Sequence, residues 1–471
     1  MLNSNIYNII AELCSLVINT CTEDFFVRYS CVSKGEKKRI NGIIREKLPV
    51  LFDGDSSKIR KISDSDLNEN FFDSLCTLID SIRGAKDFFA IVGLIQILDE
   101  SIENILQVKI AEFQADDFSV VLNTNRETSG VGLLPRCSCI WERKHRLSHS
   151  YNRMDNFLFN MLLMENSILG DLIDKHFFLK KEIFPDFARN RSLKIAATPL
   201  RLERGFDVLP YDENKVQYFR IKYQNERDSG SSEEPLFSAE NSLIWQKILT
   251  AGKNKSDIIV FPEMLGNSEM TEYITEKLKS LSDEESKSIP SLIILPSFWE
   301  KNKNFVTILD RFGNVVCRQS KQNPFRVEQG ESGYLEGIIS NFVVNIFHFE
   351  GIGRIAILIC KDFLTTKYME QLMRCFKLTL IIVPSFSTGS YDFRQSFDLC
   401  AHDDCNVVWI NTCAALEKGK EANFENIGYV RKRIGRNDDD SQRLSEMPIC
   451  KGAFSGKCGH DCIYYEVIGG V

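Results

Sequence analysis

The sequence predicts two parts: an all-helical N-terminal domain over residues 1–190 and an α/β domain over residues 191–471. In the first part, apolar residues recur at helical spacing and strand alternation is almost missing. From Ser192 onward, short apolar runs of strand length alternate with helical patterns, which indicates an α/β layer. Glycine-containing turns near Gly313 and Gly351 join neighbouring strands as hairpins, so the sheet is predicted to be mixed.

The helical prediction for the first part depends on three segments. Apolar positions follow a helical period from Ile6 to Val17, within residues 88–106 and again within residues 157–172. Residues 115–132 are more polar and are expected to form a loop or a short hairpin.

The second part contains the candidate strands and helices of the α/β layer. Strands are expected at 193–198, 257–261, 291–295, 305–309, 315–318, 342–349, 354–359, 378–383 and 407–411, with a late strand near 462–467. Helices are expected at 239–251, 270–281, 366–376 and 393–401.

Composition excludes several classes of protein. With 43% hydrophobic and 26% charged residues, the chain is neither disordered nor fibrous. A net charge of -7 argues against a general nucleic-acid binder. No apolar run reaches the ~18 residues of a membrane helix, and the start lacks the basic region of a signal peptide, so we expect a cytoplasmic protein without membrane contact. The 15 cysteines, an odd number spread over the chain, are expected to be reduced.

Three polar residues directly follow predicted strands: Glu263, Lys321 and Cys360. Each has an ordinary explanation by itself, as a turn residue, a solvated cation and a packed thiol. Together they form a chemical unit, because a carboxylate can take a thiol proton, a thiolate can attack a carbonyl or nitrile carbon, and an ammonium can stabilise the developing negative charge. A nearby lysine is also expected to lower the pKa of the thiol.

These residues lie in motifs that resemble the nitrilase (carbon–nitrogen hydrolase) superfamily. The motifs occur in the order of the family over residues 192–471: Lys194-Ile-Ala-Ala-Thr-Pro199, Asp257-Ile-Ile-Val-Phe-Pro-Glu263, Thr307-Ile-Leu-Asp-Arg-Phe-Gly-Asn-Val-Val-Cys-Arg-Gln-Ser-Lys321, Gly353-Arg-Ile-Ala-Ile-Leu-Ile-Cys-Lys-Asp362, Leu380-Ile-Ile-Val-Pro-Ser385 and Val407-Val-Trp-Ile-Asn411.

The resemblance implies an αββα sandwich with a Glu–Lys–Cys triad that hydrolyses a small-molecule amide, or less readily a nitrile, through a thioester and without a metal or organic cofactor. Glu263 would be the general base, Cys360 the nucleophile and Lys321 the stabiliser of the tetrahedral intermediate. The backbone N–H of Lys361 would complete the oxyanion site, and Asp362 would cap or orient the following helix.

A second glutamate of the family, which positions groups in the pocket, is expected at Glu328, with Glu331 as the second choice. The chain departs from the family pattern at insertions over 201–237 and 280–290 and at the cationic Lys361. These departures leave the substrate open, and acyl transfer in place of hydrolysis also stays open.

Partners are predicted from the resemblance and from one apolar face. Family members pair through helices that follow the cysteine strand, and residues 366–376 carry Met369, Leu372, Met373 and Phe376 at helical spacing, so a homo-oligomer is expected. The alternative is that the N-terminal domain folds over this face and keeps the chain monomeric. The helical domain, with the basic patch at 143–146, is a candidate for binding a protein or nucleic-acid partner.

Two further alternatives stay open. The unexplained helical domain is compatible with an effector or scaffold subunit of a multi-component system, such as bacterial anti-phage defence, beside a reverse transcriptase. Two sets of residues have zinc-ligand side chains without the usual spacing of a zinc knuckle. These sets are Cys137, Cys139, His145 and His149, and Cys450, Cys458, His460 and Cys462.

Overall fold

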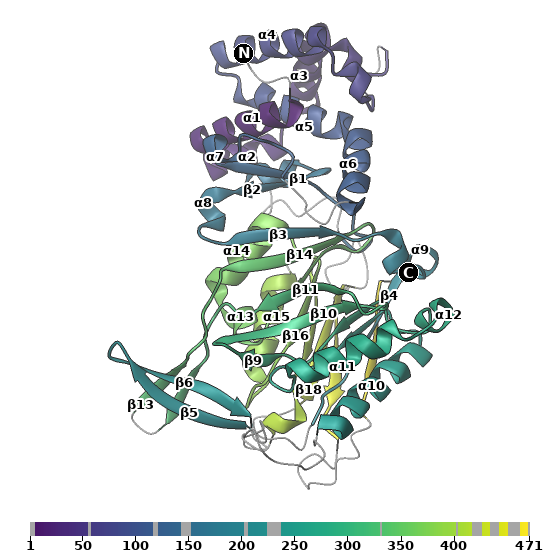
Figure 1. Cartoon of the computed structure of the whole chain (residues 1–471). Helices are drawn as coiled ribbons and strands as arrows, with labels where there is room; N and C mark the ends of the chain where they lie inside the picture. Colours follow the sequence, from purple (N-terminus) through teal and green to yellow (C-terminus); the bar gives the residue numbers. More distant parts are fainter. Residues whose placement is uncertain are drawn as a thin grey trace.

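A computed structural model describes most of the chain (Figure 1). The described residues are 5–54, 58–115, 121–142, 152–201, 206–223, 237–329, 332–401, 404–416, 426–433, 442–450 and 462–469. Helices gather in the N-terminal region, and a two-sheet sandwich follows, with a small separate sheet projecting from it (Figure 1).

The N-terminal region is rich in helices, as predicted. Its main helices are α1 (Ile6–Thr20), α2 (Glu23–Ser30), α3 (Lys34–Lys47), α4 (Glu69–Gly84), α5 (Phe88–Ser101) and α6 (Glu103–Ala115). They bury their apolar stripes in a core of their own, to which α1 contributes Ile10 and Val17, both 0% exposed. The side chain of Asn5 caps α1 by accepting a hydrogen bond from the Tyr7 N–H at 2.9 Å.

The structure adds strands to this region. β1 (Val131–Pro135) and β2 (Met161–Glu165) form an antiparallel ribbon, followed by the short helix α8 (Asn166–Leu169), where the helical period of residues 157–172 predicted a helix. The run from Met161 to Met164 is apolar because both faces of the strand are buried. Leu163 packs into the N-terminal core, whereas Leu162 and Met164 pack into the core of the sandwich.

The sandwich consists of two seven-stranded sheets. The first has the order β11 (Val315–Ser320), β10 (Lys303–Asp310), β8 (Leu292–Ile294), β7 (Ile258–Val260), β4 (Ser192–Ala197) and β20 (Tyr464–Gly469), with β9 (Phe298–Glu300) paired to β10. The second has the order β19 (Gln442–Pro448), β18 (Asn426–Arg433), β17 (Asn406–Ile410), β16 (Leu380–Pro384), β15 (Gly353–Ile357), β14 (Val343–Phe349) and β3 (Ile173–Phe178).

Alternating side chains give the αββα layering. In the first sheet, Ile258 faces the core between the sheets, and its neighbour Ile259 faces α10 (Phe237–Lys253) and α11 (Ser268–Lys279) on the outside. The second sheet is covered by α13 (Lys361–Leu364), α14 (Thr366–Phe376) and α15 (Tyr391–Ala401) (Figure 1). The predicted αββα sandwich is confirmed. The insertion at 280–290 contains the short capped helix α12 (Asp283–Ser286).

The N-terminal region is attached to the second sheet. β3 lies before residue 190 and yet pairs in parallel with β14, so the first part of the chain supplies an edge strand of the sandwich. The fully buried Arg354 of β15 forms an ion pair with Glu142 at 3.1 Å. Lys377, after α14, forms another with Asp155 at 3.0 Å. Removal of one partner of such a buried ion pair lowers the free energy of unfolding by about 3–5 kcal/mol. These two ion pairs therefore stabilise the contact between the N-terminal region and the sandwich.

The apolar face of α14 is covered within the chain. Met369, Leu372, Met373 and Phe376 are all buried, and the helix packs against β2 and α8 of the N-terminal region. Gln371 also donates a hydrogen bond to the carbonyl of Ile168 at 3.1 Å. This arrangement is the one that the monomeric alternative assumed for the face.

The homo-oligomer therefore stays a prediction from the resemblance. Its subunits would have to contact each other through a surface other than the apolar face of α14. Light scattering of the full chain over a range of micromolar concentrations checks it. A mass of at least twice 54.0 kDa supports an oligomer, and a mass that stays at 54.0 kDa contradicts it.

A four-stranded sheet lies beside the sandwich, with the order β12 (Arg326–Gln329), β13 (Ser332–Glu336), β6 (Val216–Tyr223) and β5 (Phe206–Glu213). The β5–β6 hairpin comes from the insertion that was predicted over 201–237, and it was not predicted as strands. Figure 1 shows this sheet projecting at the lower left of the view.

Two predictions about thiols and metals are only partly covered by the described residues. All described cysteines are free thiols. His145, His149, Cys458 and His460 lie outside the described residues, as does the basic patch at 143–146. Within the described ranges, His, Cys, Asp and Glu side chains form no group of three or more that could hold a metal ion. In the same part of the chain, every helix is too short or too polar to cross a bilayer.

Candidate active site

The ends of strands from both sheets bring Glu263, Lys321 and Cys360 to one cavity. Glu263 follows β7 and Lys321 follows β11 in the first sheet, and Cys360 follows β15 in the second. Their side chains are 2%, 3% and 5% exposed. The sandwich holds them rigidly because each preceding strand is paired with its neighbours.

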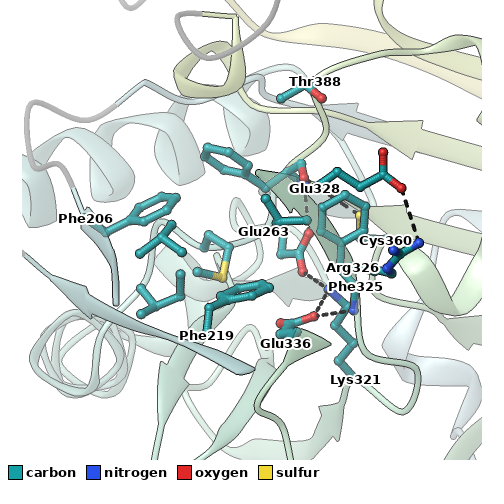
Figure 2. A pocket seen from close by; sticks show the side chains of 15 residues that line it. Phe206, Phe219, Glu263, Lys321, Phe325, Arg326, Glu328, Glu336, Cys360 and Thr388 are labelled. Carbon is teal, nitrogen blue, oxygen red and sulfur yellow. Dashed lines mark hydrogen bonds and ion pairs between the residues drawn. The ribbon is translucent and has the colours of Figure 1, made fainter. Parts of the chain in front are cut away.

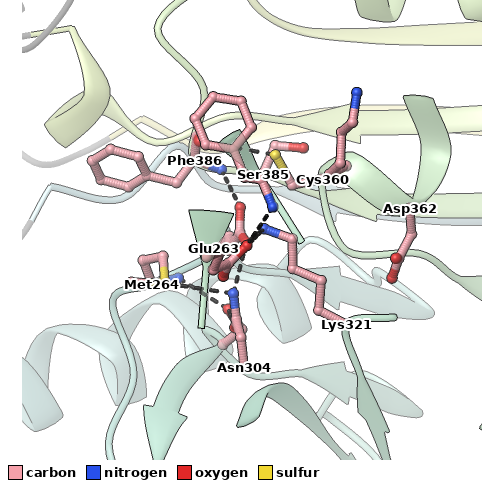
Figure 3. A network of polar contacts seen from close by, with 12 residues as sticks. Glu263, Met264, Asn304, Lys321, Cys360, Asp362, Ser385 and Phe386 are labelled. Carbon is pink, nitrogen blue, oxygen red and sulfur yellow. Dashed lines mark hydrogen bonds and ion pairs between the residues drawn. The ribbon is translucent and has the colours of Figure 1, made fainter. Parts of the chain in front are cut away.

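The Glu263 carboxylate is held by three donors (Figure 3). Its Oε1 accepts hydrogen bonds from Asn304 Nδ2 at 2.7 Å and from Lys321 Nζ at 3.0 Å, and its Oε2 accepts one from the backbone N–H of Phe386 at 2.8 Å. Burial raises the pKa of Glu263, and the nearby Glu336 carboxylate raises it further. Lys321 lowers this pKa, but the net shift is upward. A carboxylate with a raised pKa is well suited to accept and return a proton near neutral pH.

Lys321 lies between two carboxylates (Figure 2). Its Nζ is 3.0 Å from Glu263 Oε1 and 2.7 Å from Glu336 Oε2. Burial lowers the pKa of Lys321, but the two carboxylates outweigh burial and hold this pKa well above its usual value. The side chain therefore remains an ammonium.

Glu336, and not the predicted Glu328, lies beside Lys321, which corrects the expected position of the second glutamate. Glu336 is 4% exposed and also accepts hydrogen bonds from the Phe325 N–H at 2.9 Å and from Trp299 Nε1 at 3.3 Å. The Glu328 side chain is 74% exposed and pairs with Arg326 at 3.2 Å, at the edge of the cavity. Glu331 lies outside the described residues.

The reason for this correction is the β12–β13 hairpin. Its strands pair Glu328 with Gly333 near the tip and Arg326 with Leu335 near the base. Glu336 therefore returns to the level of Lys321, although it is farther away in sequence. Without the hairpin register, closeness in sequence to the lysine favoured the wrong glutamate.

Cys360 lies in a strained turn between β15 and α13. Its φ of 46° is in the left-handed region that non-glycine residues rarely adopt, and its N–H donates a hydrogen bond to the Pro384 carbonyl at 3.0 Å. The next residue after Glu263, Met264, has a φ of 72° and also lines the cavity. Both strained residues therefore lie at the wall of the same cavity.

The surroundings of the Cys360 thiol favour its neutral form over the thiolate. Burial raises the pKa of Cys360. The charge of the Glu263 carboxylate and a hydrogen bond with it also raise this pKa, whereas Lys321 lowers it. Lys321 lowers the thiol pKa, as expected, but burial and Glu263 outweigh it, so the net shift is upward. The positive charge of Lys321 is also shared by Glu263 and Glu336. A nucleophilic role for Cys360 would therefore require a base.

Lys361 and Asp362 follow the nucleophile in α13. Lys361 is the first residue of this helix, where a backbone N–H has no intrahelical acceptor. Asp362 does more than orient its own helix: it accepts hydrogen bonds from the backbone N–H groups of Gln322 at 2.9 Å and Asn323 at 2.7 Å. Burial raises its pKa to about 7. Asp362 thus connects the cysteine turn to the loop that carries Lys321.

Sequence reasoning missed Asn304, which holds Glu263 directly, and gave Asn411 no role beyond ending a motif. Asn304 is fully buried on β10, where Ser297 Oγ donates to its Oδ1 at 2.8 Å and its own carbonyl accepts from the Lys321 N–H at 2.8 Å. Asn411 holds the loop after β16 through two hydrogen bonds with the backbone of Ser387. Asn304 stands directly before the apolar run that begins at Phe305, next to Lys303, so its sequence context gave no sign that its side chain is buried.

The cavity has a volume of about 440 Å³ and combines one polar side with an apolar remainder (Figure 2). Its polar side contains Glu263, Lys321, Glu336 and Cys360. The other lining residues are Phe206, Val208, Phe219, Ile221, Met264, Phe325, Arg326, Val327, Glu328, Phe386 and Thr388. This volume accommodates a small organic molecule.

No family model matches the chain, and no curated protein matches its sequence. Solved structures match it weakly over 59% of its length. They include the C. elegans NitFhit protein (16% identity, 61% of that chain, TM-score 0.33) and Saccharomyces cerevisiae Nit3, a member of branch 10 of the nitrilase superfamily (11% identity, 90% of that chain, TM-score 0.33). A third is an amidase of the nitrilase superfamily from Nesterenkonia AN1 (12% identity, 90% of that chain, TM-score 0.36). The chain spans 61% of the NitFhit chain.

Proposed function

We propose that the protein is a carbon–nitrogen hydrolase that cleaves an amide through a thioester on Cys360. The observation that carries this proposal is the position of the Cys360 thiol at the wall of a cavity that the buried Glu263–Lys321–Glu336 cluster also lines. The cluster supplies a base with a raised pKa and an ammonium at one place. The motifs that resemble the nitrilase superfamily place the same three residues, Glu263, Lys321 and Cys360, in these roles.

The first half-reaction forms the acyl-enzyme. Cys360 Sγ attacks the amide carbon while its proton passes to Glu263, and the carbonyl oxygen becomes an oxyanion near Lys321 Nζ and the Lys361 N–H. When this intermediate collapses, the C–N bond breaks and Glu263 returns the proton to the leaving nitrogen. Ammonia or an amine departs and a thioester remains.

The second half-reaction releases the acid. Water attacks the thioester carbon and gives a proton to Glu263, with Lys321 again facing the oxyanion. Collapse breaks the C–S bond, and the proton on Glu263 goes to the departing sulfur. The carboxylic acid leaves, and Cys360 is again a thiol. A nitrile would enter the same site but needs an additional water, and we propose it as the less favoured substrate.

A panel of simple amides and nitriles tests this proposal through the release of ammonia. The proposal expects turnover by the full chain and a covalent acyl adduct on Cys360. It is overturned when no amide or nitrile of the panel is hydrolysed and no activated ester of the same acids acylates Cys360.

Glu336 and Glu328 offer a matched pair of substitutions. Glu336→Gln removes one of the two charges that hold the Lys321 ammonium, so kcat is expected to fall by about 10²-fold, the size of losing one electrostatic contact at a reacting centre. Glu328→Gln changes an exposed ion pair, and its loss of kcat is expected to be at least tenfold smaller than that of Glu336→Gln.

Steady-state kinetics of the two variants, side by side, measures this difference. Equal losses in both variants would contradict the assignment of Glu336 as the second glutamate. Thermal unfolding of each variant shows whether a loss of activity reflects a loss of fold.

A further inference from the structure

We infer that the substrate is the amide of an apolar carboxylic acid, and that the β5–β6 hairpin selects it by forming an apolar wall beside Cys360. This inference rests on the proposed function and specifies its substrate class. It is carried by one face of the hairpin, by the way this face is fixed to the site, and by the charges of the cavity.

The two faces of the hairpin differ in chemistry. The register pairs Val208 with Ile221 and Phe206 with Tyr223, so their side chains share one face of the ribbon. Asp207 pairs with Lys222 on the opposite face. Three of the four apolar residues, Phe206, Val208 and Ile221, line the cavity together with Phe219 (Figure 2). Val208 is 43% exposed, as expected of a side chain that faces an open cavity.

The wall is fixed to the catalytic strands. The Gly337 N–H donates a hydrogen bond to the Phe219 carbonyl at 2.9 Å, directly after Glu336. A Cβ at Gly337 would lie 2.2 Å from the hydroxyl of Tyr211 on β5 and 3.1 Å from the carbonyl oxygen of Phe219 on β6, so both strands of the hairpin approach closely at this point. The Tyr223 hydroxyl accepts a hydrogen bond from the Trp299 N–H at 3.1 Å. The hairpin is therefore a fixed part of the cavity.

The charged side chains that line the cavity form ion pairs with one another. Glu263 and Glu336 pair with Lys321, and at the edge Arg326 pairs with Glu328. Among the described lining residues, every ionised side chain thus already has a partner of opposite charge. The rest of the wall is almost entirely apolar, with Met264 and Phe386 packed near the hairpin. A neutral, apolar substituent fits this lining better than a charged one, because burying a charge without a partner is costly.

We assign the apolar substituent to the acyl part of the amide. The acyl part stays on Cys360 through both half-reactions, next to the wall, whereas the nitrogen leaves after the first. Each methylene that leaves water for an apolar wall gains about fourfold in the binding of the transition state. From acetamide to hexanamide, kcat/KM is expected to rise by about 10²-fold.

The experiment compares acetamide, butyramide and hexanamide by ammonia release. N-hexylacetamide is the amine-side counterpart, and its hydrolysis is followed by the release of hexylamine. The p-nitrophenyl esters of acetic, butyric and hexanoic acids are used in parallel to acylate Cys360, followed by intact mass. The variant Val208→Ser/Ile221→Ser changes the cross-strand pair of the wall. The control Asp207→Ser/Lys222→Ser changes the adjacent pair on the opposite face.

The ratio of hexanamide to acetamide kcat/KM is the readout, because it does not depend on the fraction of folded protein. It is expected to fall at least tenfold in Val208→Ser/Ile221→Ser and to stay within twofold in the control. A second variant, Val208→Trp, fills the cavity next to the hairpin and is expected to lower the same ratio.

The outcomes separate this inference from the proposed function. Hydrolysis with a flat or falling dependence on acyl length, a preference for N-hexylacetamide over hexanamide, or an unchanged ratio in both wall variants overturns the inference and leaves the hydrolase intact. The lack of both hydrolysis and acylation of Cys360 overturns the proposed function and the inference with it.

Discussion

Cys360→Ala is expected to abolish amide hydrolysis, with kcat at least ~10⁴-fold below that of the unmodified chain. The reason is that no other side chain on the polar side of the cavity is a nucleophile: Glu263, Lys321 and Glu336 are engaged with one another. The fold should survive, because removing a buried sulfur at a strained position leaves the paired strands unchanged. Ammonia release under single-turnover conditions measures the effect.

Cys400→Ala is the matched control. Cys400 is also a buried thiol, 0% exposed, and lies on α15 away from the cavity lining. Its substitution should leave kcat within a few-fold of that of the unmodified chain. Residual hydrolysis above about 1% in Cys360→Ala, with the control intact, would show that another group carries the reaction.

Glu263→Gln is expected to lower kcat/KM by about 10²–10⁴-fold, the usual contribution of a general base. The raised pKa of Glu263 also sets the sign of the pH dependence. Glu263 must be ionised to accept the thiol proton, so kcat/KM falls as the pH drops through its pKa. This acid limb should therefore lie above the ordinary glutamate pKa of about 4.3, and the variant should lose it.

A second readout separates the base from a merely structural role. The Glu263 carboxylate is one of the causes that raise the pKa of the Cys360 thiol. In Glu263→Gln this pKa should fall, so iodoacetamide should alkylate Cys360 faster at neutral pH while hydrolysis is slower. Slower alkylation together with slower hydrolysis would indicate a collapsed site and contradict the assigned role.

The sandwich could be predicted from the sequence because its strands are short apolar runs with turn residues at their ends. The ends of β7, β15 and β16 lie within one or two residues of their predicted limits. Glu263, Lys321 and Cys360 could be singled out for the same reason, since each directly follows such a run.

Other elements depend on long-range packing and could not be predicted. β2 is apolar on both faces because two cores meet there, and an apolar run of this kind resembles a buried helix. The β5–β6 hairpin has an exposed outer face and lies in what was read as an insertion. Glu336 and Asn304 become recognisable only when the hairpin register and the pairing of β10 with β11 place them beside Lys321 and Glu263.

The pKa of Cys360 shows the limit of pairwise reasoning. A lysine near a cysteine usually lowers the thiol pKa. Here two carboxylates share that lysine, and the remaining effect of burial and Glu263 has the opposite sign. The direction of the pKa shift of Cys360 therefore follows only when burial and all neighbouring charges are considered together.

The proposed mechanism requires a covalent thioester on Cys360. Rapid acid quenching of the full chain during turnover of p-nitrophenyl hexanoate, followed by intact mass and peptide mapping, detects this adduct. We expect one hexanoyl group per chain on the peptide that contains Cys360, formed and lost at rates compatible with turnover, and no such group in Cys360→Ala. A hexanoyl group on another residue, or turnover without any acyl adduct, would contradict this mechanism.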